Sequence, residues 1–278
     1  NPVIAGPKDK RGLYSGARHG THVAGIIGAV RNNGVGINGV AANVKIMTLR
    51  AVPNGDEYDK DVAHAIRYAA DNGARVINMS FGKSFKTSLY PEVDKAARYA
   101  VKKGVILVHA SGNDGMDLDL PESTNYPTAF YLGEDKAIKG WLEVGASTPY
   151  LDGSLAAGFS NYGKKKVHIF APGVKIRSTI PTNKKGKMYQ SLRGTSMASP
   201  VVAGVAALVL SHYPKIPPAR LQSLLMNSSR KSASSLLVSV PGEEKLAPFG
   251  QLSISGGIVD AYNALLRIAL DDYSNQWR

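Results

Sequence analysis

Five nearly continuous apolar stretches divide the chain, and none is long enough for a helix of ordinary length. Runs of this kind, in which polar and apolar residues do not alternate, are typical of strands buried on both faces of a parallel sheet. We therefore predict buried strands at residues 44–52, 74–80, 105–110, 141–147 and 166–173.

Amphipathic or apolar segments with helical spacing alternate with these runs. Residues 59–73 bring Val62 and Ile66 to one face and end in a glycine, which commonly terminates helices. Residues 91–104 begin with proline and end in Lys-Lys-Gly, as helices often do. Further helices are predicted at 197–213, 217–227 and 257–270. This alternation predicts one α/β domain, with helices on both faces of a mostly parallel sheet.

Composition narrows the function classes. The 278 residues, 44% of them hydrophobic, suit one large domain, and the longest apolar run, 201–210, is about half a bilayer span. The chain has no cysteine, which excludes disulfides, thiolate catalysis and cysteine-ligated zinc. The net charge of +13 allows nucleic-acid binding, but the lysines form short scattered clusters at 102–103, 164–166 and 184–187. These clusters indicate solvated loops, and no nucleic-acid-binding motif accompanies them.

Three short motifs carry candidate chemistry. Ser196 begins an apolar helix, where free backbone N–H groups and the helix dipole stabilise negative charge. Asn113 follows a buried strand and could donate its amide to an oxyanion. His19 lies near the start of a glycine-rich helix and could act as a general base. Taken singly, each has an ordinary alternative: a helix cap, an Asn turn and a structural histidine.

Together, the motifs resemble a known family. "HGTHVAG" at residue 19 and "GTSMASP" at 194 are similar to the histidine and serine signatures of subtilisin-like serine proteases, the subtilases, and "VINMSFG", "SGNDG" and "APG" lie between them in that family's order. The resemblance implies the subtilisin-like three-layer fold. It also implies a serine endopeptidase, in which Ser196 attacks the scissile carbonyl, His19 is the general base and acid, and the oxyanion is held by Asn113 and the Ser196 N–H.

The resemblance also implies where a peptide substrate binds. Ser80, Phe81 and Gly82 would pair with the substrate backbone as one wall of the cleft. Ala110, Ser111 and Gly112 would form the facing wall of the pocket for the residue before the cut bond. Asn125 is expected near the floor of that pocket. Phe81 suggests an apolar contact with the substrate, and Arg193 and Asp114 could bias its preference for charge.

Two other patterns point to ligands but fit poorly. "GVGING" at 34–39 matches a dinucleotide fingerprint, yet it follows a predicted helix instead of a strand. We therefore expect no required cofactor. In the resembled family a calcium-binding loop occupies this place, so a structural calcium near Asn33 is allowed. His19 and His22 have the spacing of zinc ligands but lack a third ligand, so we predict no zinc site.

The carboxylate that subtilases place before the histidine has no counterpart here. Only Asp9 precedes His19, and it lies between lysines without a convincing strand, whereas Asp114 and Asp260 occupy other contexts. We expect residues 1–16 to be the end of an exposed loop or insertion, as in bacterial subtilases with a long insertion between the Asp and the His. The first strand and its Asp would then belong to an upstream fragment of the same precursor.

Three alternatives to a hydrolase assembled from such fragments remain open. The chain could be an expression truncation, an inactive subtilase-fold peptide-binding protein (a pseudoprotease), or a transpeptidase whose acyl-enzyme is captured by an amine. The family resemblance implies a secreted, periplasmic or cell-surface bacterial protein. From the length of the apolar runs we expect no membrane-spanning segment.

Overall fold

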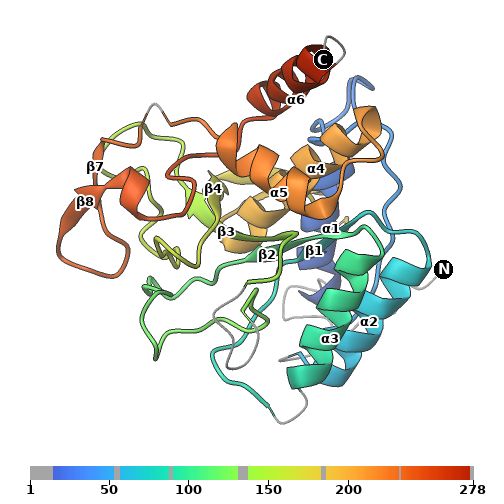
Figure 1. Ribbon diagram of the computed structural model, residues 1–278, viewed down its shortest axis with the longest axis horizontal. Helices are drawn as coiled ribbons and strands as arrows, with labels where there is room; N and C mark the ends of the chain where they lie inside the picture. The colour runs from blue at the N-terminus through green and yellow to red at the C-terminus, as the bar shows by residue number, and fades with distance from the viewer. Residues whose placement is uncertain are drawn as a thin grey trace.

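The central sheet of the computed structural model is parallel and has four strands in the order β1-β2-β3-β4 (Figure 1). The strands are β1 (Val76–Met79), β2 (Ile106–Ala110), β3 (Trp141–Ser147) and β4 (Ile169–Pro172). The structure describes residues 15–52, 57–87, 90–130, 137–182, 186–231 and 233–275. Four of the five predicted strands are therefore confirmed. Their continuous apolar sequences match a parallel sheet that is covered on both faces.

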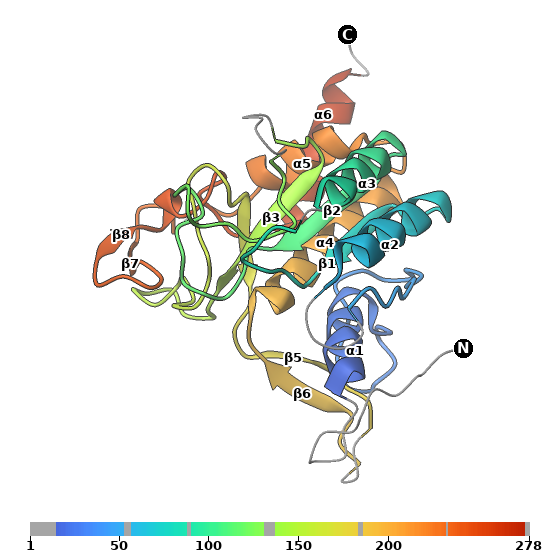
Figure 2. The same ribbon diagram turned by 90° about the horizontal axis from the view of Figure 1, so that it is seen from below.

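Helices cover both faces of this sheet. α2 (Asp59–Asp71) and α3 (Tyr90–Lys102) pack on the face that contains Leu107 and Trp141. The opposite face, with Ile106 and Val108, packs against α4 (Thr195–His212), α5 (Pro218–Asn227) and α6 (Ala261–Asn275). The two layers of helices lie on either side of the strands in Figure 2. The predicted three-layer α/β architecture is confirmed.

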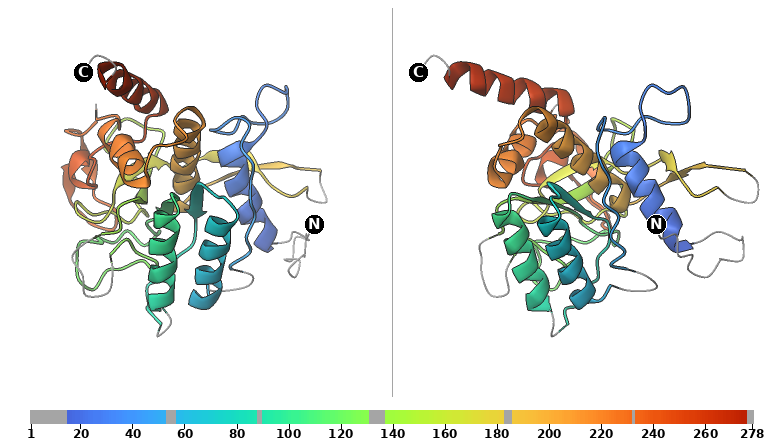
Figure 3. Two further views of the ribbon diagram at one scale, coloured as in Figure 1. Left: turned by 45° about the vertical axis from the view of Figure 1, so that its right-hand side comes forward. Right: turned by 90° about the vertical axis from the view of Figure 1, so that its right-hand side faces the viewer.

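Two antiparallel ribbons are added to this framework and were not predicted. β5 (Ile176–Thr179) pairs with β6 (Tyr189–Leu192), and β7 (Leu237–Ser239) pairs with β8 (Leu246–Pro248), which leads into a short 3-10 helix, η1 (Phe249–Gln251). Both ribbons project from the body of the molecule (Figures 2 and 3). α1 (Ser15–Gly28) lies against α4 and β5, where Ser178 Oγ donates to the His22 carbonyl at 2.7 Å.

The strand predicted at 44–52 is wrong. These residues form no strand in the structure, and the side chains of 45–48 are exposed. A strand requires a neighbour to accept and donate its backbone hydrogen bonds, and the described residues offer none beside this segment. Ala51 nevertheless packs on the same apolar cluster as Ile77 of β1, so the segment and the sheet edge flank one core.

The apolar helix α4 is the centre of the domain. Its 18 residues are long and apolar enough to span a membrane by length and composition alone, but 67% of them are buried inside the protein. Val202, Ala203 and Ala206 pack directly on the sheet. Core packing therefore accounts for the composition of α4.

Candidate active site

The candidate residues lie where strands end and helices begin. Parallel strands bring their carboxyl ends to one edge of a sheet, and functional groups gather there. Residues 80–82 follow β1, residues 111–113 follow β2, and Thr195 is the first residue of α4. The fold therefore brings three segments that are far apart in sequence to the same edge.

Ser196 is in the first turn of α4 and is held against the end of β1. Its Oγ donates to the Ser80 carbonyl at 3.2 Å, and Ser80 Oγ donates back to the Ser196 carbonyl at 3.0 Å. Gly194, before the helix, has φ = 145°, which favours glycine because a Cβ would be strained there. The Ser196 N–H is one of the first four of the helix, which have no acceptor within it.

Asn113 is fixed beside Ser196 by the preceding threonine. Its Oδ1 accepts from the Thr195 backbone N–H at 2.9 Å and from Thr195 Oγ1 at 3.1 Å. Thr195 Oγ1 also accepts from the Gly112 N–H at 3.2 Å. With its oxygen occupied, the amide of Asn113 has its two N–H donors left for another acceptor, as an oxyanion-binding group requires.

The two proposed walls of the cleft are joined by a buried amide. Asn125 Nδ2 donates to the Ala110 carbonyl at 2.8 Å, and Asn125 lies so close to Gly82 that a Cβ at that position would collide with it. Ser111 Oγ donates to the Asn161 carbonyl at 3.0 Å, which anchors the second wall from behind. Asn125 thus lies between the walls, where a pocket floor was expected.

His19 lies in the second turn of α1, and its side chain is exposed. Partial withdrawal from water, together with the nearby His22 and Arg18, holds the pKa of His19 below the ordinary value of 6.5. In the part of the chain that the structure describes, His19 makes no hydrogen bond to Ser196 or to a carboxylate. Asp9, the only acid before it, lies outside the described residues.

The residues considered for metals have other contacts. His22 is fully buried, and its Nε2 donates to the Gln190 carbonyl at 3.0 Å, so that nitrogen is not available to a metal. Asn33 Oδ1 accepts from the Val35 N–H at 3.0 Å, and residues 33–36 are exposed. No group of three or more potential His, Cys, Asp or Glu ligands gathers within the described ranges. These contacts do not test the calcium ion that the sequence allows near Asn33.

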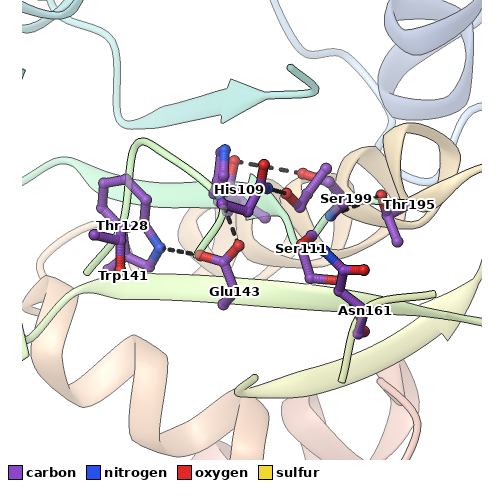
Figure 4. A network of polar contacts seen from close by, with 12 residues as sticks. His109, Ser111, Thr128, Trp141, Glu143, Asn161, Thr195 and Ser199 are labelled. Carbon is purple, nitrogen blue, oxygen red and sulfur yellow. Dashed lines mark hydrogen bonds and ion pairs between the residues drawn. The ribbon is translucent and has the colours of Figure 1, made fainter. Parts of the chain in front are cut away.

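A buried polar network behind the site was missed at the sequence level. His109 of β2 contacts the Glu143 carboxylate of β3, which also accepts from Trp141 Nε1 at 2.8 Å (Figure 4). The available signal was a single charged or ionisable residue in each of two otherwise apolar strands, "VILVHA" and "WLEVGAS". Buried polar groups of this kind have to pair with one another.

Comparison with known proteins identifies the family of the chain. The profile of the subtilase family matches residues 3–251. The thermophilic serine proteinase of Bacillus sp. (strain AK1) is 44% identical over 194 residues, which are 69% of this chain and 42% of that protein. The extracellular basic protease of Dichelobacter nodosus is 33% identical over 285 residues, which cover 96% of this chain and 42% of the relative.

A solved structure shows the same fold. A protease from Pseudoalteromonas arctica PAMC 21717 superimposes with a TM-score of 0.70 at 30% identity, over 90% of this chain and 70% of that one. The present chain thus spans less than half the length of the two curated relatives named above. From the extent of the family match and the shared fold, we conclude that the chain belongs to the subtilase family.

Proposed function

We propose that this chain is the main part of a serine endopeptidase that hydrolyses peptide bonds through an acyl-enzyme on Ser196. The observation that carries the proposal is the anchored pair beside the nucleophile: Thr195 holds the oxygen of Asn113 by two hydrogen bonds, at the N-terminus of α4. A preorganised amide next to a helix-terminal hydroxyl can stabilise the oxyanion that acyl transfer generates.

The proposed reaction uses the side chains in a fixed order. Ser196 Oγ attacks the scissile carbonyl while His19 takes its proton, and the oxyanion accepts from Asn113 and the Ser196 N–H. His19 then returns the proton to the leaving amine, and water hydrolyses the acyl-enzyme by the same path. In the present structure Ser196 Oγ donates to Ser80 instead of His19, so the catalytic hydrogen bond would have to form on substrate binding.

Peptide substrates would bind as an added strand. Residues 80–82 continue from β1 and supply backbone donors and acceptors, and residues 110–112 face them across the buried Asn125. Main-chain pairing recognises any extended peptide, and the pocket between the walls would select the side chain before the cut bond. Phe81, Arg193 and Asp114 remain candidates for that selection.

We propose further that the acid which orients His19 comes from an upstream segment that is not among these residues. Among the described residues, β1 pairs with β2 alone, and its side chains are only half-buried up to Met79, although its apolar sequence is typical of a central strand. On the far side of the same apolar cluster, residues 44–52 run without a strand partner within the described ranges. A strand inserted between β1 and residues 44–52 would pair with both segments.

A secreted or cell-surface location is part of this proposal. One relative is called an extracellular protease in its name, and the likeness to that protein extends over 96% of this chain. The chain's strong positive charge is compatible with this location but does not determine it.

The proposal is tested by peptide hydrolysis in a sample whose composition is known. Intact mass and N-terminal sequencing would first establish which segments accompany this chain. We expect the preparation to hydrolyse peptides, and we expect Ser196→Ala to remove that activity without loss of fold. Peptide binding without cleavage by a preparation that contains the acid-bearing segment would favour the pseudoprotease. Amide products with an added amine nucleophile, in place of hydrolysis products, would favour a transpeptidase.

A further inference from the structure

A histidine and a glutamate are paired in the core directly behind the cleft. His109 is in β2 and Glu143 lies opposite it in β3, at the same position in the parallel register. His109 is fully buried and Glu143 is 4% exposed. His109 Nδ1 is 2.7 Å from Glu143 Oε1, and the labelled side chains face each other across the two strands in Figure 4.

The second nitrogen of His109 reaches the cleft wall. Nε2 lies 2.8 Å from the Phe81 carbonyl oxygen, which can only accept, so Nε2 must carry a hydrogen and donate it. The contact with Glu143 contains a second hydrogen, whether it is on the ring or on the carboxyl group. In either case Glu143 fixes the ring in the form that donates to Phe81, as a partner on one ring nitrogen fixes the other.

This contact sets the orientation of one peptide plane in the wall. Ser80 and Phe81 carbonyls point in different directions, because the first accepts from Ser196 Oγ and the second from His109. In a trans peptide, the carbonyl of one residue and the N–H of the next point to opposite sides. With the Phe81 carbonyl held towards the core, the Gly82 N–H is directed away from it, to the side where a peptide would lie.

Both carboxylate oxygens of Glu143 have a partner, which restricts the orientation of this side chain. Its Oε2 accepts from Trp141 Nε1 at 2.8 Å, and its backbone N–H donates to His168 Nδ1 at 3.0 Å. Even a fully ionised buried pair contributes little net stability compared with apolar residues of similar volume. Stability alone therefore gives no reason for a histidine and a carboxylate in these two strands.

We propose that His109 and Glu143 are positioning residues that aim the Gly82 N–H at the backbone of a bound peptide. The inference rests on the proposed peptide cleft and adds two residues to it that do not touch the substrate. His109 and Glu143 would raise the affinity for extended peptides and would take no part in the chemistry at Ser196. A ligand that reaches only Ser196 and its pocket would not depend on them.

Two variants separate positioning from structure. Replacing both residues, as His109→Leu with Glu143→Leu, removes the hold on Phe81 without leaving a buried charge unpaired. Glu143→Gln is the matched control. Its amide oxygen can accept from Trp141 and its N–H can donate to His109 Nδ1, so Nε2 still donates to Phe81.

The measurement is the equilibrium affinity for two boronic acids that add to Ser196, one carrying a single residue and one carrying an extended peptide. We expect the double leucine variant to lose about five- to tenfold in affinity for the extended ligand, the effect of one poorly oriented hydrogen bond. Its affinity for the single-residue ligand should change less than twofold. Glu143→Gln should bind both ligands like the parent protein.

Each other outcome has a definite meaning. If the parent protein binds neither boronic acid, the proposed peptidase site fails and the inference fails with it. If the parent binds both and the double variant keeps its preference for the extended ligand, the positioning role alone is wrong. Equal loss for both ligands would also overturn it, because that result indicates a general structural role.

A second measurement needs no variant and covers the case in which the double variant does not fold. In the parent protein, NMR should show a slowly exchanging proton on His109 Nε2, since that proton is buried and donated to Phe81. An unprotonated Nε2 would contradict the proposed hold on the peptide plane.

Discussion

At the residue scale, the site depends on Thr195 as much as on the residues that would react. Thr195 Oγ1 accepts from the Gly112 N–H and donates to Asn113 Oδ1, so one hydroxyl joins the proposed cleft wall to the proposed oxyanion donor. The "GTS" motif places this threonine beside Ser196 in sequence. What the motif could not show is that the partner of Thr195 lies 82 residues earlier.

Removing the Thr195 hydroxyl should slow acyl transfer. In Thr195→Val, Asn113 keeps only the backbone N–H of residue 195 as its anchor, and its amide becomes less well oriented. Loss of an oxyanion donor reduces kcat by about 10²–10³-fold. We therefore expect Thr195→Val to lower kcat by about tenfold, and Asn113→Ala by the full amount, in steady-state hydrolysis of a peptide. An unchanged kcat in Asn113→Ala would remove this residue from the mechanism.

The ionisation of His19 is a second test at this scale. Partial desolvation, His22 and Arg18 all lower the pKa of His19, so the ring should already be mostly neutral at pH 6.5. We expect its NMR titration midpoint in this chain to lie below 6.5, and Arg18→Gln to raise it. Arg267→Gln, on the distant helix α6, serves as the control. A midpoint above 6.5 would show that a carboxylate already accompanies His19.

At the element scale, the sequence predicts what its local pattern determines. Helices α2 to α6 and strands β1 to β4 follow from periodicity, glycine and proline signals, and continuous apolar runs. The segment at 44–52 fails because strand formation depends on a neighbour, and composition says nothing about whether one is present. The ribbons β5–β6 and β7–β8 were missed because three- and four-residue strands with mixed polarity carry no clear pattern.

In the candidate site, too, the sequence predicts what lies in a local motif and misses what depends on the fold. His19, Asn113 and Ser196 could be proposed from the sequence because each lies in a recognisable motif. His109 and Glu143 were not found, since they are joined only by the register of β2 and β3. Register is a property of the folded sheet, and a sequence without a fold does not reveal it.

The packing of α1 against β5 provides a stability test at the element scale. A Cβ on Gly25 would collide with the side chains of Ser178 and Thr179, whereas nothing lies within 4 Å of a Cβ on Gly20 in the same helix. We expect Gly25→Ala to lower the free energy of unfolding by about 1–3 kcal/mol. Gly20→Ala should raise it by about 0.5–1 kcal/mol, because alanine favours helix. Denaturant titration measures both, and equal effects would show that α1 does not pack as described.

At the scale of the whole molecule, we propose that this subtilase-family domain pairs with an upstream segment. The four-stranded sheet leaves β1 with a single partner, and His19 has no carboxylate among the described residues. Both features would be explained by one added strand that carries an acid. The proposed pocket walls, oxyanion donor and nucleophile are held by hydrogen bonds within the chain.

The most direct test of the central claim is covalent labelling of the active serine. The protein, with whatever segments accompany it, is treated with an organophosphonate probe, and the adduct is mapped by mass spectrometry. The account predicts one adduct, on Ser196, no adduct in Ser196→Ala, and much slower labelling in His19→Ala. Failure to label Ser196 in a preparation that contains the acid-bearing strand, or an undiminished rate in His19→Ala, would contradict it.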